Sequence, residues 1–322
     1  MKEPVKIVAI GAGVQDVFLQ GKIFKPHRED DGEMVEEFEL GSKNDIDGVV
    51  FSTGGGGTNA AVTFARQGLH SCYMGHLGDD VAAQAVLDDL HHEYVDTSLV
   101  KHEKEVGTGY SSLLLAPSGE RTILTYRGAS ANFTLREADF HGARADWFYV
   151  SSLGGNIEAL QIVLDYAIAH DIKVALNPGK GELQHRAELK KLLPNLAILG
   201  LNKDELQMIF EGESLQELVI KAAEHVPCVI GTDGPKGVIA FYDNTLYKAG
   251  MYDDVQVVDR TGAGDAFNSG FVALASSGAS MEQAITFASA NSTSVVGKIG
   301  AKAGILGEHA KLHAMPISVV KL

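Results

Sequence analysis

The chain has 322 residues, 45% hydrophobic and 21% charged, a composition typical of a globular protein with one large domain or two. Its formal net charge of −15 argues against nucleic acid or an anionic membrane surface as the main partner. The two cysteines, Cys72 and Cys228, stand alone in their segments, which excludes a disulfide framework and a zinc-finger spacing. Because no apolar run resembles a signal sequence or a membrane span, we expect a cytoplasmic protein.

The first predicted element is a short apolar run over residues 7–10, which is typical of a buried parallel strand. Gly11 and Gly13 follow, but Asp16 stands where the third glycine of a dinucleotide-binding loop would lie, so we reject a dinucleotide site. Asp16 is therefore either a turn residue that caps its own backbone or an acid that binds a ligand. Residues 17–50 predict exposed strands and an acidic loop.

A glycine run comes next, from Gly54 to Gly57, and precedes Asn59 and a small-residue helix expected over residues 60–67. Such a run lets a ligand approach the backbone closely, and Asn59 offers an amide at the helix start. The alternative is a flexible loop with an asparagine cap. No Gly-Lys-Ser or Gly-Lys-Thr follows, which excludes a P-loop nucleotide site.

The middle of the chain predicts a helix over residues 80–93 and two strands, 110–115 and 122–126, joined by a hairpin loop at 116–121. Arg127 ends the second strand, either as a solvated charge or as a contact to a polar substrate. From residue 147 strands and helices alternate, with strands at 147–150, 172–176 and 196–199 and a helix at 157–168. Repeated units of this kind imply a parallel sheet that binds ligands at the carboxyl ends of its strands.

Two polar segments follow strands of this region. Asn202 and Glu205 have the spacing of a helix capping box, which is their simplest interpretation in isolation. Farther along, strands at 228–231 and 238–241 flank a glycine-rich turn that contains Gly234 and Gly237.

The segment of residues 255–267 carries the strongest chemical signal. Valines at 255, 257 and 258 predict a buried strand, after which Gly262 and Gly264 bracket Ala263 at the start of an apolar helix expected over 266–277. Backbone N–H groups and the positive end of that helix form a site for an anion such as a phosphoryl group in transfer. Asp265 at its edge would repel phosphate, but it is well placed to take a proton from an attacking hydroxyl. The alternative for Asp265 is a helix cap.

The last predicted elements are a helix over residues 281–296 and, within 305–322, a docked strand or an exposed tail.

Four of these segments resemble the motifs of the ribokinase-like (pfkB-type) carbohydrate kinases. The string Asp-x-Thr-Gly-Ala-Gly-Asp-Ala-Phe, which starts at Asp259, is similar to the C-terminal signature of the family. The glycines before Asn59, together with residues 75–80, resemble the N-terminal signature of the family. Two shorter segments resemble two shorter family motifs: Asn202-x-x-Glu205 and Thr232-x-Gly234-x-x-Gly237. The motifs occur in the order of the family across almost the whole chain. The sequence departs from the pattern at Arg260, where many members have Thr or Pro, and at Gly56, where ribokinases proper carry Lys.

The resemblance implies an α/β fold, a three-layer α/β/α sandwich with a mainly parallel central sheet and a small β-sheet lid. Residues 1–16, 51–105 and 128–322 would form the main domain, and residues 17–50 and 106–127 the lid, which often doubles as a homodimer surface. The implied activity is an ATP-dependent kinase that phosphorylates a hydroxyl of a small sugar or sugar acid. A nucleoside kinase with the same centre and a non-catalytic sugar-binding protein are the alternatives.

The resemblance also implies roles for single residues. Asp265 would be the general base, beside an anion hole formed by Gly262, Ala263 and Gly264. The sugar would contact Asp16, Gly55, Gly56, Asn59 and Arg127. ATP would lie along Asn202, Thr232, Gly234, Gly237 and Asn291. Glu205 would hold Mg²⁺ through water, and the Asp259 region with residues 300–304 would hold a monovalent cation such as K⁺.

Overall fold

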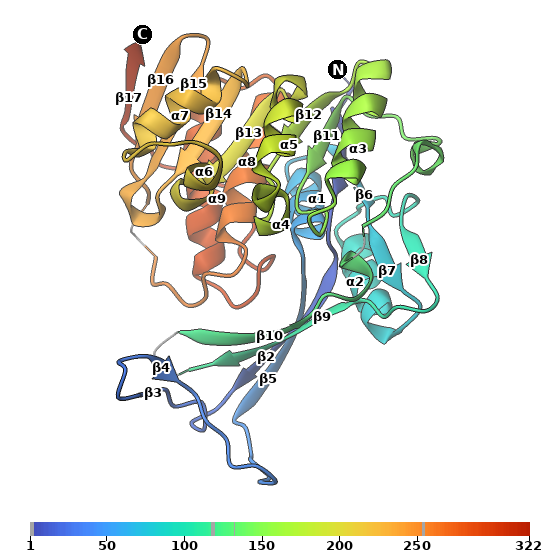
Figure 1. The fold of residues 1–322 in the computed structure, drawn as a ribbon, viewed down its shortest axis with the longest axis vertical. Helices are drawn as coiled ribbons and strands as arrows, with labels where there is room; N and C mark the ends of the chain where they lie inside the picture. The colour runs from blue at the N-terminus through green and yellow to red at the C-terminus, as the bar shows by residue number, and fades with distance from the viewer. Residues whose placement is uncertain (1–2, 117–119, 132, 253–254) are drawn as a thin grey trace.

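The structure, a computed structural model, describes residues 3–116, 120–131, 133–252 and 255–322. Its largest sheet has nine strands among these residues, in the order β17-β16-β15-β14-β13-β12-β11-β1-β6 (Figure 1). Six are parallel: β6 (His70–Met74), β1 (Lys6–Ile10), β11 (Trp147–Val150), β12 (Lys173–Leu176), β13 (Ile198–Asn202) and β14 (Cys228–Thr232). The antiparallel edge contains β15 (Val238–Tyr242), β16 (Thr245–Ala249) and β17 (Ile317–Lys321).

Side chains alternate across this sheet and divide the core into two layers. In β1, Val8 and Ile10 pack in one core, whereas Ile7 and Ala9 pack in the other. The first core is covered by α3 (Ile157–Ala169), α4 (Lys180–Gln184), α5 (Arg186–Leu192), α6 (Lys203–Ile209) and α7 (Leu215–Ala223). The second core is covered by α1 (Gly56–Arg66), α2 (Val81–His92), α8 (Ala263–Ser276) and α9 (Met281–Val296). This is the expected three-layer α/β/α sandwich. None of the described helices is long and apolar enough to cross a membrane.

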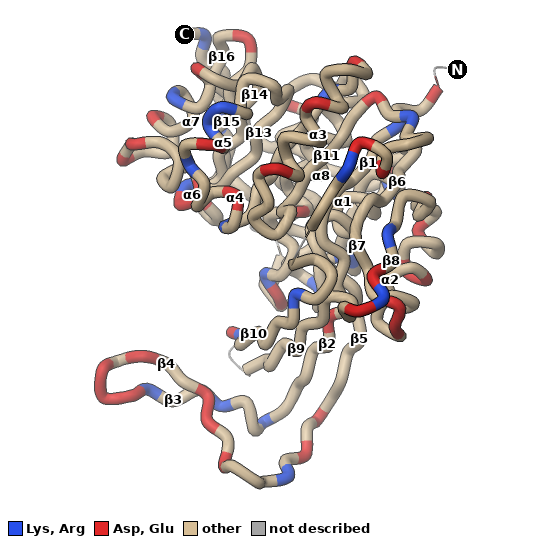
Figure 2. Tube along the Cα trace, turned by 45° about the vertical axis from the view of Figure 1, so that its right-hand side comes forward, with Lys and Arg blue, Asp and Glu red and all other residues tan. Residues whose placement is uncertain are grey.

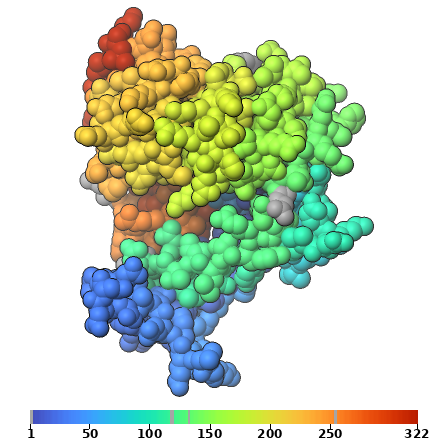
Figure 3. Space-filling view, viewed as in Figure 1, coloured from blue at the N-terminus to red at the C-terminus, as the bar shows by residue number. Residues whose placement is uncertain are grey.

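A second sheet extends away from the sandwich and is called the projecting sheet below. It contains β10 (Arg121–Tyr126), β9 (Gly109–Leu115), β2 (Val14–Gln20) and β5 (Gly48–Gly54), in that order. Figure 3 shows it as a lobe below the main body. Its strands β2 and β5 include residues 14–16 and 51–54, which the expected division of the chain assigned to the main domain. A third, two-stranded sheet of β7 (His76–Gly78) and β8 (Lys101–Glu103) lies beside α2.

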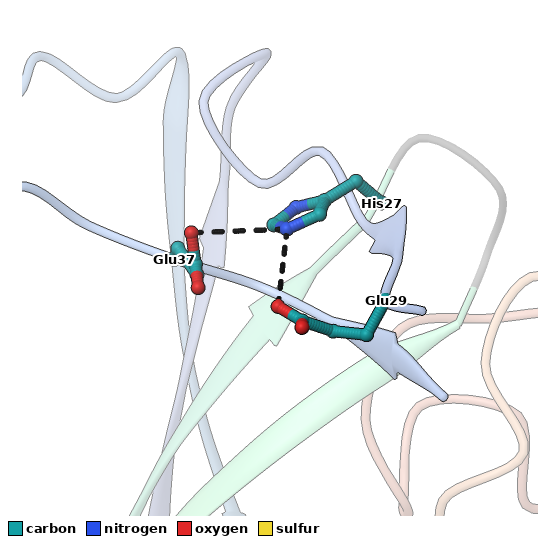
Figure 4. Close-up of side chains that lie close together, drawn as sticks. All are labelled: His27, Glu29 and Glu37. Atoms are coloured by element: carbon teal, nitrogen blue, oxygen red, sulfur yellow. Dashed lines mark ion pairs between the residues drawn. The ribbon is translucent and has the colours of Figure 1, made fainter. Parts of the chain in front are cut away.

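The far end of the projecting lobe is acidic, as Figure 2 shows around β3 (His27–Arg28) and β4 (Met34–Val35). There His27 lies 3.7 Å from a carboxylate oxygen of Glu29 and 3.7 Å from one of Glu37 (Figure 4). All three side chains are exposed, so such ion pairs add little to stability. We assign no site to this cluster.

Several predicted elements need correction. No strand forms over residues 255–258, where Val257 and Val258 are 49% and 41% exposed; they line a groove against the projecting sheet instead. The helix expected at 60–67 begins at Gly56, because Gly55 with a φ of 96° serves as its N-cap. The strand expected at 196–199 spans Ile198–Asn202. The hairpin loop expected at 116–121 includes residues 117–119, which lie outside the described residues.

The strand order of the main sheet predicts where a ligand binds. β1 has β6 on one side and β11 on the other, so the chain winds in opposite directions from this point. In open parallel sheets a crevice forms at such a switch, outside the carboxyl ends of the strands.

Candidate active site

A cavity of about 300 Å³ lies at this switch. Its wall comes from the segments that follow β1, β11, β12, β13 and β14, and from the start of α8. It is lined by Ala12, Gly56, Ser151, Ser152, Asn177, Pro178, Gly179, Asn202, Glu205, Thr232, Arg260, Gly262, Ala263, Gly264, Asp265 and Asn268.

The turn before α8 presents backbone donors to this cavity. Gly262 has a left-handed φ of 78°, and a Cβ there would lie 2.5 Å from the Cβ of Ala301, so the position requires glycine. The helical ladder begins where Ala266 N–H donates to Gly262 O at 2.8 Å. The earlier N–H groups of Gly264 and Asp265 therefore have no intrahelical acceptor. Together with the positive helix end, they provide an anion site.

Asp265 lies in the first turn of α8, and its Oδ2 accepts a 2.8 Å hydrogen bond from Nδ2 of Asn59. Burial raises the pKa of Asp265 above its ordinary value, and the hydrogen bond from Asn59 opposes that shift. Asn59 itself is only 3% exposed and is absent from the cavity lining. The two side chains, one from α1 and one from α8, thus hold a carboxylate beside free backbone donors.

Asp16 lies on β2 of the projecting sheet, opposite Ser52 of β5, and does not line the cavity. It is only 5% exposed, and burial raises its pKa to about 6, against the effects of a hydrogen bond with Ser111 and the charge of Lys302. A Cβ at Gly54 would lie 2.2 Å from Oδ2 of Asp16, so this glycine leaves room for the carboxylate. The structure therefore shows a buried acid and not a solvated turn residue.

Asn202 and Glu205 form the capping box, and both also line the cavity. Glu205 N–H donates to Oδ1 of Asn202 at 2.9 Å, and Asn202 N–H donates to Oε2 of Glu205 at 2.9 Å. Burial raises the pKa of Glu205, and the negative charge of Asp265 adds to the shift. The two interpretations of this pair are therefore compatible, because the cap also points an acid at the cavity.

Other predicted site residues lie apart from the cavity. Arg127 is exposed at the end of β10, and Gly234 is exposed in a turn. Gly237 has a φ of 98° and fits closely against Ala249 O, which gives it a clear structural role. Gly55 is the N-cap of α1, where a Cβ would lie 2.4 Å from Ala12 O.

Asn291 differs from expectation, because its side chain is fully buried. Its Nδ2 donates to Ala266 O and its Oδ1 accepts from Leu306 N–H, both at 2.8 Å. It therefore offers a nucleotide no side-chain atom and instead joins α8 to α9. Its neighbours Ala290 and Ser294 line a separate cavity of about 320 Å³.

Several lining residues were not predicted from the sequence. Ser151 and Ser152 follow β11, and Asn177 follows β12, where its amide donates to Gly200 O at 2.9 Å. The rule that ligands bind at carboxyl ends of strands was the available signal. The fully buried Glu182 had no such signal. It accepts N–H bonds from Leu153, Gly155 and Gly179 and so fixes two loops of the cavity wall.

Comparison with known proteins agrees with this geometry. Residues 32–306 match the family model described as pfkB family carbohydrate kinase. A ribokinase of Staphylococcus aureus is 29% identical over 264 residues, which cover 78% of this chain and 84% of that protein.

Two solved structures share the fold. A nucleoside kinase of Burkholderia thailandensis in complex with inosine superimposes with a TM-score of 0.75 at 17% identity, covering 94% of this chain and 95% of that one. A putative ribokinase II from E. coli in complex with ATP and Mg²⁺ has a TM-score of 0.75 at 18% identity, covering 94% and 96%.

Proposed function

The chain belongs to the pfkB family of carbohydrate kinases and is an ATP-dependent carbohydrate kinase, and we propose that it phosphorylates a hydroxyl of a small sugar or sugar acid with Asp265 as the general base. The observation that carries the proposal is the arrangement of Asp265. Its carboxylate accepts a hydrogen bond from Asn59 at 2.8 Å and lies in the same helical turn as the N–H groups of Gly264 and Asp265, which donate to no backbone carbonyl of the described residues. A base and an anion hole in one turn suit phosphoryl transfer to a hydroxyl.

In the proposed mechanism, Asp265 accepts the proton of the substrate hydroxyl as the oxygen attacks the γ-phosphate in line. The raised pKa of Asp265 makes its carboxylate a stronger base than an exposed aspartate. The free N–H groups of Gly264 and Asp265 and the helix end stabilise the charge on the transferred group, whereas the N–H of Ala263 donates to Arg260 O at 3.4 Å. The projecting sheet acts as a lid that excludes water, which would otherwise compete as acceptor.

The cavity residues fit ATP and Mg²⁺. The N-terminus of α8 would bind the phosphates of ATP. Asn202 and Thr232 line the adjoining wall of the same cavity. Glu205 supplies a carboxylate whose burial and whose neighbour Asp265 both favour a nearby cation. We propose that Glu205 holds Mg²⁺ through water and that the metal neutralises phosphate charge when bound. The neighbouring E. coli structure in complex with ATP and Mg²⁺ supports this choice.

The acceptor is proposed to lie between the cavity and the projecting sheet, where Asp16 would bind sugar hydroxyls. Among the described residues no cation lies within ion-pair distance of Asp16, and a buried carboxylate of this kind suits hydroxyl donors better than the apolar face of a purine. Because a nucleoside kinase is among the structures that share the fold, a nucleoside is the second candidate for the acceptor.

We also propose a homodimer through the projecting sheet. One face of this sheet carries five exposed large side chains: Val49, Phe51, Tyr110, Leu124 and Tyr126. An apolar patch of this kind marks an interaction surface, and a second copy offers the same face. Light scattering should show a dimer that Leu124→Glu converts to a monomer, with the exposed Ile168→Glu of α3 as control. A monomeric wild-type protein would contradict this proposal.

A coupled ATP-consumption assay tests the function, over pentoses, hexoses, ketodeoxygluconate, sugar phosphates and nucleosides. We expect turnover with a sugar or sugar acid, and a fall in kcat on the order of 10²–10⁴-fold in Asp265→Asn with sugar binding retained by calorimetry. Near-normal turnover of this variant would contradict the base assignment. Turnover of nucleosides alone would establish the second candidate, and ATP binding without any turnover would indicate a binding protein.

A further inference from the structure

The carboxylate of Asp259 precedes the anion-binding turn and accepts most of its hydrogen bonds from within the protein. Asp259 is 2% exposed. Its Oδ1 accepts hydrogen bonds from the N–H of Thr261 at 2.9 Å and from the hydroxyl of Thr261 at 2.7 Å. Its Oδ2 accepts from the N–H of Gly300 at 3.1 Å. A carboxylate has about four lone-pair positions, so three are taken by these donors.

The remaining lone-pair position is on Oδ2, and a positive side chain from the projecting sheet approaches the other oxygen, Oδ1. Nε of Arg121, the first residue of β10, lies 3.7 Å from Oδ1 of Asp259. This Nε is buried and has no hydrogen-bond partner among the described residues. A buried guanidinium nitrogen without an acceptor is costly unless it is paired with an opposite charge. Within the described part of the chain, Asp259 is the carboxylate that lies within ion-pair distance, so the geometry indicates a direct pairing.

This arrangement does not fit the monovalent metal cation that the family resemblance implies for the Asp259 region. Such a cation needs several oxygen atoms whose lone pairs are free to replace its hydration shell. Here both oxygens of Asp259 face N–H or O–H donors, and a metal ion beside them would meet the charge of Arg121. The following loop, residues 300–304, also contains a cationic side chain of the protein itself. The buried ammonium of Lys302 contacts Thr53 at 2.6 Å and Asp89 at 2.9 Å.

We infer that the guanidinium of Arg121 is the resident cation of the Asp259 site, in place of a monovalent metal ion, and that it ties the projecting sheet to the anion-binding turn. Asp259 orients Thr261, which directly precedes Gly262. When the guanidinium of Arg121 neutralises the charge of Asp259, it therefore also stabilises the conformation of the turn at Gly262. The 3.7 Å separation exceeds that of a charge-assisted hydrogen bond. Movement of the projecting sheet toward the body by about 1 Å would complete the bond. Closure of the projecting sheet and alignment of the anion-binding turn would then occur together, because both depend on the contact between Arg121 and Asp259.

The test compares KCl with tetramethylammonium chloride, whose cation is too large for the site, at matched ionic strength. In the wild-type protein we expect the same melting temperature, the same ATP affinity by calorimetry and the same turnover in both salts. In Arg121→Ala we expect ATP affinity and turnover in tetramethylammonium to fall on the order of tenfold or more, because a buried carboxylate loses its counter-charge. Arg121→Lys should restore part of this loss.

The control is Arg28→Gln, which removes a charge of the projecting lobe whose guanidinium donates to Gly32 O and forms no described ion pair with Asp259. It should behave as wild type in both salts. A wild-type melting temperature or ATP affinity that rises specifically with K⁺ would overturn the inference, as would an Arg121→Ala variant indistinguishable from wild type. Only the turnover arm rests on the proposed function, so absent turnover in every salt would contradict that function while melting and ATP binding still decide the role of Arg121.

Discussion

Nδ2 of Asn59 donates a 2.8 Å hydrogen bond to Oδ2 of Asp265, although 206 positions separate the two residues. The bond crosses from α1 to α8, which pack against each other on one face of the main sheet. The family resemblance implied that Asn59 contacts the sugar. The geometry supports a second role, in which Asn59 fixes the orientation of the proposed base and holds it in its ionised form.

The first prediction concerns Asn59→Ala. We expect kcat to fall on the order of tenfold to a hundredfold, because the carboxylate of Asp265 loses its orientation. Since the bond from Asn59 lowers the pKa of Asp265, its loss should also move the acid limb of the kcat/KM profile to higher pH. The measurement is kcat/KM as a function of pH.

A control for this variant is Asn156→Ala, which removes the N-cap of α3, a residue that does not line the cavity, and should cost about 1 kcal/mol of stability without moving the pH profile. An Asn59→Ala variant with a lower kcat and an unmoved acid limb would show that Asn59 acts on the substrate and not on the base.

The second prediction uses the raised pKa of Asp16, which shifts from an ordinary 3.8 to about 6. Between these values the folded state keeps a proton that the unfolded state loses, so stability falls as pH rises through this window. Asp16→Asn removes the effect and should stabilise the protein by about 2–3 kcal/mol more at about pH 8 than at about pH 4. Urea unfolding at both pH values measures this difference, and the same variant should lose sugar binding.

The exposed Asp30→Asn of the acidic loop is the matched control for that experiment and should show no pH-dependent gain. An Asp16→Asn variant that is equally stable relative to wild type at both pH values would mean that Asp16 is not buried in the folded protein.

How much the sequence could predict depended on whether a signal is local. The strand of Trp147–Val150 and the helix of Met281–Val296 follow from apolar periodicity alone, and both were predicted with their observed bounds. The valines at 257 and 258 failed this rule, since they have no strand partner and line a groove that the projecting sheet also borders. The motif glycines predicted the turn at Gly262, but no local pattern shows that Asn59 reaches Asp265 or that Arg121 reaches Asp259.

Lys302 is another residue whose role needed tertiary information. Lys302 is 5% exposed, and its ammonium contacts Oγ1 of Thr53 and Oδ2 of Asp89, which are hydrogen-bonded to each other. The third prediction is that Lys302→Met destabilises the protein by about 1–3 kcal/mol, because Asp89 keeps a buried charge with partial access to water. Urea unfolding measures the change.

A double-mutant cycle shows whether the ion pair is the cause. Adding Asp89→Asn to Lys302→Met should recover part of the loss, since no uncompensated charge then remains. Additive losses in the double variant would indicate that Lys302 stabilises the fold through its aliphatic packing alone.

The fourth prediction separates the two roles of Glu205. Glu205→Gln keeps the capping box, because glutamine accepts the same N–H bond, so the melting temperature should not change. The variant loses its charge, and we expect the Mg²⁺ concentration for half-maximal turnover to rise about tenfold. Glu217→Gln makes the same change in the capping box of α7 with Ser214 and should leave the Mg²⁺ dependence unaltered. If both variants keep the wild-type Mg²⁺ dependence, Glu205 is only a helix cap, and the metal must be held by the phosphates and other cavity residues.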